Sequence, residues 1–213
     1  MVTLIGDPGS CHDGDLGKAR ELIKIGADAG LSAVKLQLLQ PAQCQNGNIM
    51  LNWEHLPDLI DLGKSLGVEV FASAFDLSGV EWLASCGCKS IKFAYSQTDL
   101  LSDARVRNLL PNFSRVYVSL DVMKPKPTNL ELISLYCVPE YPIRYVLDFE
   151  GIFQRFSGFS SHCLGVQQEI RAVEAGAKFL EFHYKGAWDS RCPDARFAKS
   201  PKLAGELCRR IRG

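Results

Sequence analysis

Two short apolar segments near the end of the sequence each finish on a histidine. They are residues 158–162 and 179–183, and a helix-length segment separates them. We predict that both are parallel strands, whose neighbouring ends would bring His162 and His183 into one pocket. Imidazole is a common ligand of divalent transition metals, and two imidazoles leave coordination positions open for substrate or water. The pattern therefore predicts a metal site.

Two polar side chains share the strand faces of these histidines. Alternation along a strand places Ser160 on the face of His162 and Glu181 on the face of His183. We interpret Glu181 as a hydrogen-bonding partner of the site or as a further ligand. A single histidine of this kind is more commonly a hydrogen-bonded residue of a polar core. The matched placement of the two histidines favours the metal site.

Two further strand segments carry lysines in the phase opposite their apolar side chains. Residues 33–37 present Lys35 and Gln37 in this way, and residues 90–94 present Lys92. In a barrel the apolar phase would face the surrounding helices, so the lysines would point inward. We therefore expect two ammonium groups inside the fold.

An ammonium group inside a barrel is costly unless an anion meets it. One interpretation is a doubly charged ligand that carries a phosphate and a carboxylate. The alternative is that each lysine pairs with a structural carboxylate such as Asp7 or Glu181. Two lysines together with two strand-end histidines favour the ligand.

The elements that must position these residues alternate between strand and helix along the chain. Hydrophobic periodicity and Gly or Pro boundaries predict them. The predicted strands are 2–6, 33–37, 68–73, 90–93, 116–120, 133–137, 158–162 and 179–183. The predicted helices are 15–29, 53–66, 77–85, 102–109, 145–156, 165–175 and 201–211, with an abbreviated crossover through 124–127.

This alternation predicts an α/β fold with parallel strands and right-handed crossovers, closed as a (β/α)8 TIM barrel. We expect one domain over residues 1–213, with shortened helices after the fifth and sixth strands. An open doubly wound sheet is the alternative, although no Gly-x-Gly-x-x-Gly motif opens the first helix.

Composition narrows the classes of partner. The 213 residues are 46% hydrophobic and contain 24 basic and 24 acidic side chains, so overall charge predicts neither a nucleic acid nor a membrane partner. The eight cysteines are scattered, and no N-terminal apolar segment with a basic flank precedes them. We therefore expect a reducing cytoplasm. No run approaches the roughly 20 apolar residues that span a bilayer.

The segments that carry these polar residues resemble a known family in their order and spacing. The resemblance covers nearly the whole chain and is to the catalytic barrel of the sialic acid synthases, which condense phosphoenolpyruvate with an N-acetylated amino sugar. It is carried by segments 6–14, 29–37, 70–76, 90–92, 140–142, 159–162, 179–183 and 192–194.

The resemblance implies a role for each candidate residue. It implies that His162 and His183 hold a divalent metal, manganese first, with magnesium or cobalt as alternatives. It further implies a catalytic set of Asp7, Lys35, Lys92 and His183, and a substrate-binding set of Gln37, Ser73, Ser119, Tyr141, Ser160, Glu181 and Asp194. Both lysines and the three serines would surround phosphoenolpyruvate, while Tyr141 would line the acceptor side.

Several positions depart from the family pattern. Asp7 stands where a glutamate is usual, Pro139 where an asparagine is common, and segments 11–14, 95–97 and 160–162 differ from the usual motifs. The sequence ends directly after the last barrel helix, so we expect the family's C-terminal antifreeze-like domain to be absent. These departures concern the acceptor more than phosphoenolpyruvate.

Three functions therefore stand as hypotheses. The first is metal-dependent condensation of phosphoenolpyruvate with an aldehyde acceptor such as N-acetylmannosamine or a relative, giving a sialic-acid-like 2-keto acid and phosphate. The second is a Schiff-base aldolase with Lys35 or Lys92 as nucleophile. The third is a non-catalytic barrel that binds a phosphate ligand. The expected partners are phosphoenolpyruvate and a small aldehyde or amino sugar, with a homodimer left open.

Overall fold

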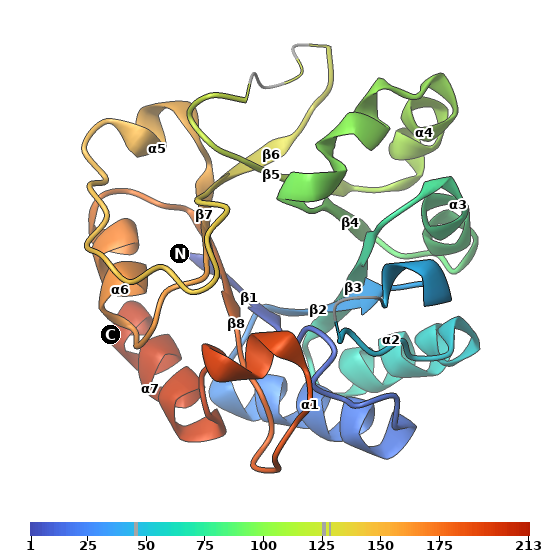
Figure 1. The fold of residues 1–213 in the computed structure, drawn as a ribbon, viewed down its shortest axis with the longest axis horizontal. Helices are drawn as coiled ribbons and strands as arrows, with labels where there is room; N and C mark the ends of the chain where they lie inside the picture. The colour runs from blue at the N-terminus through green and yellow to red at the C-terminus, as the bar shows by residue number, and fades with distance from the viewer. Residues whose placement is uncertain (45–46, 125–126, 128) are drawn as a thin grey trace.

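Eight parallel strands close into a barrel around the centre of the molecule (Figure 1). The computed structural model describes residues 1–44, 47–124, 127 and 129–213. The strands follow chain order, and the first pairs with the last, which confirms the predicted TIM barrel. They are β1 (Thr3–Asp7), β2 (Ala33–Leu38), β3 (Glu69–Ala74), β4 (Ser90–Phe93), β5 (Arg115–Leu120), β6 (Ile133–Cys137), β7 (Gly158–Ser161) and β8 (Phe179–His183).

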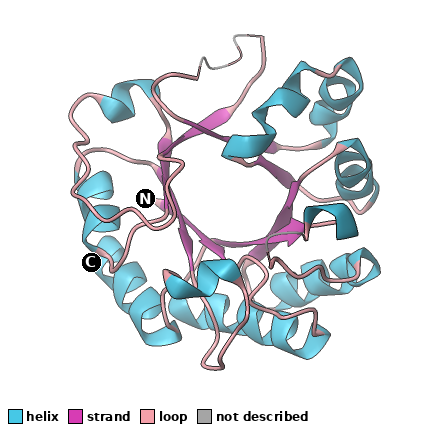
Figure 2. Cartoon of the chain, viewed as in Figure 1, coloured by secondary structure: helices cyan, strands magenta, loops and turns pink. Residues whose placement is uncertain are grey.

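The helices lie outside the barrel and cover most of its circumference (Figure 2). The α-helices are α1 (Leu16–Ala29), α2 (Leu56–Ser65), α3 (Leu77–Ser85), α4 (Ala104–Leu109), α5 (Ile152–Arg155), α6 (Gln167–Glu174) and α7 (Pro201–Arg212). Short 3-10 helices are η1 (Pro41–Gln43), η2 (Trp53–His55), η3 (Tyr95–Ser102), η4 (Leu110–Asn112) and η5 (Pro193–Arg196). Within the described ranges, no helix combines the length and apolar character needed to cross a membrane.

The first helix shows how local sequence sets these boundaries. Asp15 caps α1 by accepting a hydrogen bond from the backbone N–H of Lys18 at 2.8 Å. Gly30 ends the helix with a φ of 84°, a left-handed conformation that glycine adopts without a steric penalty. The predicted glycine stop is confirmed, and α1 turns its buried face toward the strands.

The prediction of a helix over residues 145–156 is wrong for most of that segment. Only Ile152–Arg155 form α5, after Gly151 in a left-handed conformation. Ahead of it, Leu147 and Phe149 are buried at alternate positions, which is an extended rather than a helical period. Exposed apolar residues around them completed a helical pattern that packing does not use.

One other crossover also differs from its prediction. The helix predicted over 102–109 begins at Ala104 and is preceded by η3, which was not predicted. The crossover predicted through 124–127 falls partly outside the described residues. Between β5 and β6 the described residues contain no helix, and after β6 α5 has four residues. Shortened helices after the fifth and sixth strands are therefore confirmed.

The interior of the barrel is divided along its axis. At the end where the strands begin, an apolar layer of Ile5, Ala33, Phe71 and Tyr117 fills the lumen. The rings of Phe71 and Tyr117 stack with centroids 5.5 Å apart. Polar side chains occupy the positions two residues further along each strand, because alternate residues face inward. The apolar layer thus closes one end of the barrel beneath the polar one.

Gly158, the first residue of β7, is required by a close approach between strands. A Cβ atom there would overlap the carbonyl oxygen of Phe179 and lie 2.6 Å from its Cβ. Real Cβ atoms do not approach so closely, so any larger residue must displace β7 or β8. These are the strands that carry the two histidines.

Gly158→Ala is expected to lower the free energy of unfolding by roughly 1–3 kcal/mol, the usual cost of overpacking. Gly79→Ala is the matched control. Gly79 lies within α3, and a Cβ there would meet only ordinary contacts of 3.4 Å or more. Urea unfolding of both variants measures the difference. Equal stability of the two variants would contradict the close approach.

His12 supports the loop that follows β1. Its side chain is 1% exposed, and its Nδ1 accepts a hydrogen bond from the N–H of Gly14 at 3.0 Å. Burial lowers the pKa of His12 to about 4, although the charge of Asp13 acts in the opposite direction. The structure therefore buries His12 as an uncharged hydrogen-bond acceptor.

The lowered pKa of His12 predicts a pH dependence of stability. From pH 6.5 down to about 4 the unfolded chain binds a proton at His12 that the folded chain does not, so the free energy of unfolding falls with falling pH. Its contribution to the slope is at most about 1.4 kcal/mol per pH unit. His12→Asn keeps an acceptor for the N–H of Gly14 but does not titrate. The free energy of unfolding of this variant should therefore fall less steeply with falling pH. Parallel pH profiles in urea unfolding would contradict this.

Candidate active site

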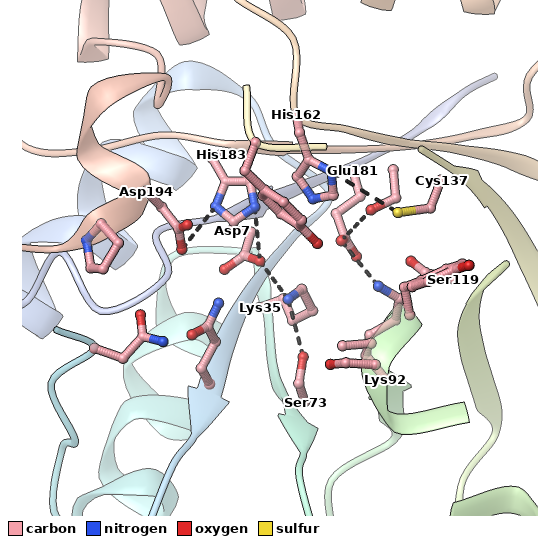
Figure 3. A pocket seen from close by; sticks show the side chains of 18 of the residues that line it. Asp7, Lys35, Ser73, Lys92, Ser119, Cys137, His162, Glu181, His183 and Asp194 are labelled. Carbon is pink, nitrogen blue, oxygen red and sulfur yellow. Dashed lines mark hydrogen bonds and ion pairs between the residues drawn. The ribbon is translucent and has the colours of Figure 1, made fainter. Parts of the chain in front are cut away.

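All of the site residues predicted from the sequence line one cavity of about 460 Å³ at the C-terminal end of the barrel (Figure 3). Each strand contributes an inward side chain at or near its end. The predicted residues that line it are Asp7, Lys35, Gln37, Ser73, Lys92, Ser119, Tyr141, Ser160, His162, Glu181, His183 and Asp194. The structure therefore brings the predicted side chains together in one cavity.

Asp7, the last residue of β1, forms an ion pair with Lys35 of β2. Lys35 Nζ lies 2.6 Å from Asp7 Oδ2 and donates a second hydrogen bond to Ser73 Oγ at 3.1 Å. The other oxygen of Asp7 accepts the N–H of Gly9 at 2.8 Å. The two charged side chains are 3% and 4% exposed, so each depends on the other for neutralisation.

A second ion pair crosses the barrel between Lys92 of β4 and Glu181 of β8. Lys92 Nζ lies 3.0 Å from Glu181 Oε1, which also accepts a hydrogen bond from Ser160 Oγ at 2.9 Å. Glu181 Oε2 has no hydrogen-bond partner among the described residues. That buried oxygen is available to a ligand that donates a hydrogen bond, because such atoms are rarely left unpaired.

Burial and charge act against each other on these groups. Burial raises the pKa of Asp7, but the charges of Lys35 and His183 outweigh it and hold that pKa below its ordinary value. The pKa of Glu181 is also lowered, because Lys92 and Lys35 outweigh its burial. Burial lowers the pKa of Lys35, but Asp7 and Glu181 raise it overall. These groups are therefore held in their charged forms.

The structure thus realises the pairing that the sequence left as an alternative. Lys35 pairs with Asp7 and Lys92 with Glu181. An ammonium group has three N–H donors, and Glu181 accepts one from Lys92. The pairing and a bound anion are therefore compatible, since donors remain that can face the cavity.

The two histidines face each other at the mouth of the cavity. His162 directly follows β7, which ends at Ser161, and His183 ends β8. Their ring centroids are 5.5 Å apart, and the ring of Phe197 lies 6.0 Å from one and 5.1 Å from the other. Both are 5% exposed. Their convergence is the arrangement that the strand pattern predicted.

Electrostatics favour the uncharged form of His162. Burial and then the neighbouring His183 lower the pKa of His162 to about 3. Its Nδ1 lies 3.3 Å from the carbonyl oxygen of Val138, so protonation at Nδ1 would leave the lone pair on Nε2. An imidazole in this state is competent to bind a metal.

His183 lies between two carboxylates. Its Nε2 is 3.7 Å from Asp7 Oδ2 and its Nδ1 is 3.7 Å from Asp194 Oδ2, and Nδ1 has no hydrogen-bond partner in the described part of the chain. The donor set of two imidazoles fits a divalent transition metal. Among the described residues, no three His, Cys, Asp or Glu side chains form a ready metal cluster. Other ligands would have to come from water or substrate.

Several residues that line the cavity were not predicted. Tyr95 and Ser96 follow β4, and Cys137 ends β6, so the strand-end rule could have found them. Asn48 comes from a loop and Arg196 ends the short helix η5, so neither belongs to a strand whose periodicity could predict it. Tyr95 Oη donates to Asp121 Oδ2 at 2.7 Å, and this bond is the main reason that its pKa rises to about 12.

Comparisons with known proteins agree with this geometry. A sequence model described as the NeuB family matches residues 45–213. N,N'-diacetyllegionaminic acid synthase of Legionella pneumophila is 26% identical over 252 residues, which cover 98% of this chain and 71% of that protein. The human N-acetylneuraminate-9-phosphate synthase is 23% identical, and the match covers 98% of this chain and 69% of the human protein.

A solved structure supports the same fold. The N-acetylneuraminic acid (sialic acid) synthetase of Leptospira borgpetersenii, in complex with citrate, superposes with a TM-score of 0.81 at 24% identity. The match covers 99% of this chain and 84% of that one. Together with the family match, these findings confirm the resemblance in the sequence. The chain belongs to the NeuB family and thereby to the phosphoenolpyruvate-dependent transferases that form a carbon–carbon bond.

Proposed function

We propose that this protein condenses phosphoenolpyruvate with the aldehyde group of an N-acetylated amino sugar, N-acetylmannosamine or a relative. The products are a sialic-acid-like 2-keto acid and phosphate. The proposal is supported above all by one observation: two lysine–carboxylate pairs, three serine hydroxyls and two histidines converge on a single cavity of a NeuB-family barrel. That set combines anion binding with electrophilic activation of a carbonyl.

The lysines and serines would bind the anionic substrate. Lys92 keeps N–H donors beyond the one accepted by Glu181, and Ser119 presents its hydroxyl to the same cavity, whereas the hydroxyl hydrogen of Ser160 is donated to Glu181. Phosphate and carboxylate oxygens accept hydrogen bonds from such donors. Because Ser119 and Ser160 are each 2% exposed, water competes little with the substrate there.

The acceptor would lie toward the mouth of the cavity. Tyr141 packs against His162 with ring centroids 4.0 Å apart and ring planes inclined at 38°, and it lines the cavity together with Asp194. Asp7 holds Lys35 in place and lies beside His183, so it orders both halves of the site. The methylene carbon of phosphoenolpyruvate attacks the aldehyde carbon, and the aldehyde oxygen takes up a proton to become a hydroxyl. Water adds to the neighbouring carbon, which bears the phosphate, and releases its protons as that carbon becomes the keto group. The bond from this carbon to the phosphate oxygen breaks, and inorganic phosphate leaves.

His162 and His183 would hold a divalent metal, which we propose to be manganese, with magnesium or cobalt as alternatives. When bound there, the metal supplies Lewis-acid polarisation of the acceptor's aldehyde oxygen. The uncharged His162 and the unpartnered Nδ1 of His183 support this assignment. Asp7, whose Oδ2 lies 3.7 Å from the other ring nitrogen, Nε2, would orient that ring.

The electrostatics argue against a Schiff-base aldolase that uses Lys35. A lysine nucleophile needs a lowered pKa so that its free amine is populated. The pKa of Lys35 is instead raised, since Asp7 and Glu181 outweigh the effect of burial. We therefore favour the synthase over an aldolase that uses Lys35.

His183→Ala is expected to reduce phosphate release from phosphoenolpyruvate by about 100-fold or more, because it removes a proposed metal ligand. The assay contains manganese and N-acetylmannosamine, with other aldehydes as alternative acceptors. His55→Ala is the matched control, since His55 lies in η2 and does not line the cavity.

Two results would contradict the proposal. One is phosphate release of the same rate after metal is removed by chelation. The other is unchanged activity in His183→Ala, which would remove the histidine pair from the reaction. Binding of phosphoenolpyruvate without turnover across the aldehyde panel would instead favour the non-catalytic barrel.

A further inference from the structure

A fully buried ion pair lies outside the cavity, behind the strands that carry the histidines. Lys199 Nζ is 2.6 Å from Glu169 Oε1, and the two side chains are 1% and 0% exposed. Neither residue lines the cavity. Glu169 Oε2 has no hydrogen-bond partner in the described part of the chain. Such a pair is a weak source of stability, because desolvation offsets the attraction, so its placement calls for another explanation.

The ion pair holds the chain on both sides of His162. Ser161 Oγ donates to Glu169 Oε1 at 2.6 Å, and Lys199 Nζ donates to the carbonyl oxygen of Cys163 at 2.8 Å. The N–H of Cys163 donates to Ser161 Oγ at 3.2 Å. β7 ends at Ser161, and beyond it the carbonyl oxygen of His162 accepts the N–H of Ile143 at 3.0 Å, so the ion pair and this bond together hold the backbone of His162.

Lys199 also contacts the strand of the second histidine. Its backbone N–H donates to the carbonyl oxygen of His183 at 2.8 Å, and its own carbonyl accepts the N–H of Lys185 at 2.9 Å. The main chain of Lys199 therefore holds the backbone of His183. The side chain of Lys199 holds the backbone of Cys163, the residue after His162. Glu169 completes the link from α6.

We propose that Glu169 and Lys199 are positioning residues that set the relative placement of the two imidazoles. The inference rests on the proposed function, in which these imidazoles bind a divalent metal. A two-histidine site needs its ligands held within about 0.5 Å and 10–20° of the productive geometry. The ion pair supplies that restraint from behind, without contact with metal or substrate.

The test separates positioning from stability by measuring manganese binding alone, by calorimetry and by the electron paramagnetic resonance spectrum of the bound ion. Lys199→Met removes the donor to Cys163 and should weaken manganese binding about tenfold. Combining it with Glu169→Gln removes both charges at similar side-chain size, which is often neutral for folding. The double variant should therefore stay folded and still bind manganese about tenfold more weakly.

Glu69→Gln is the control, because it breaks the partly buried ion pair of Glu69 with Arg115 at the opposite end of the barrel. Its manganese affinity should equal that of the unmodified protein. Wild-type affinity in a folded double variant would overturn the inference while leaving the proposed function intact. Absence of manganese binding by the unmodified protein would contradict the metal assignment and overturn the inference with it.

Discussion

Two ammonium groups enclosed in a barrel must be neutralised there, and the rest of the site is arranged around that requirement. Lys35 and Lys92 meet it through Asp7 and Glu181, which come from two strands that are neighbours at the closure of the barrel. The charges of the lysines outweigh the effect of burial on the pKa of Asp7 and Glu181, so both carboxylates stay ionised. The apolar layer beneath closes the opposite end of the lumen. The result is a cavity at the C-terminal end of the barrel that is lined by charged side chains, as anion binding requires.

Much of this arrangement could be predicted from the sequence, because the side-chain period of a strand is two residues. Once the strands were placed, Lys35 and Lys92 had to point inward opposite their apolar neighbours, and the two strand-end histidines had to share an edge. The strand bounds needed shifts of only a residue or two, as where β7 ends at Ser161 rather than His162. Parallel register then fixed which side chains meet.

Other features depend on packing that no local pattern encodes. The apolar residues of segment 145–156 fit a helical period, yet most of the segment packs as an extended loop. Arg196 lines the cavity from the short helix η5, and Glu169 and Lys199 form an ion pair between residues that are distant in sequence. The burial of His12 likewise follows from the fold of its loop. Roles in catalysis stay predictions, since geometry brings residues together without showing what they bind.

In the proposed function, the paired lysines and the paired histidines form one site for phosphoenolpyruvate and a metal. A crystal structure with phosphoenolpyruvate and manganese, using the anomalous signal of manganese, tests it most directly. We expect one anomalous peak between His162 and His183, with the phosphate and carboxylate of phosphoenolpyruvate against Lys35 and Lys92. A manganese peak away from both imidazoles, or substrate bound outside the barrel mouth, would contradict it.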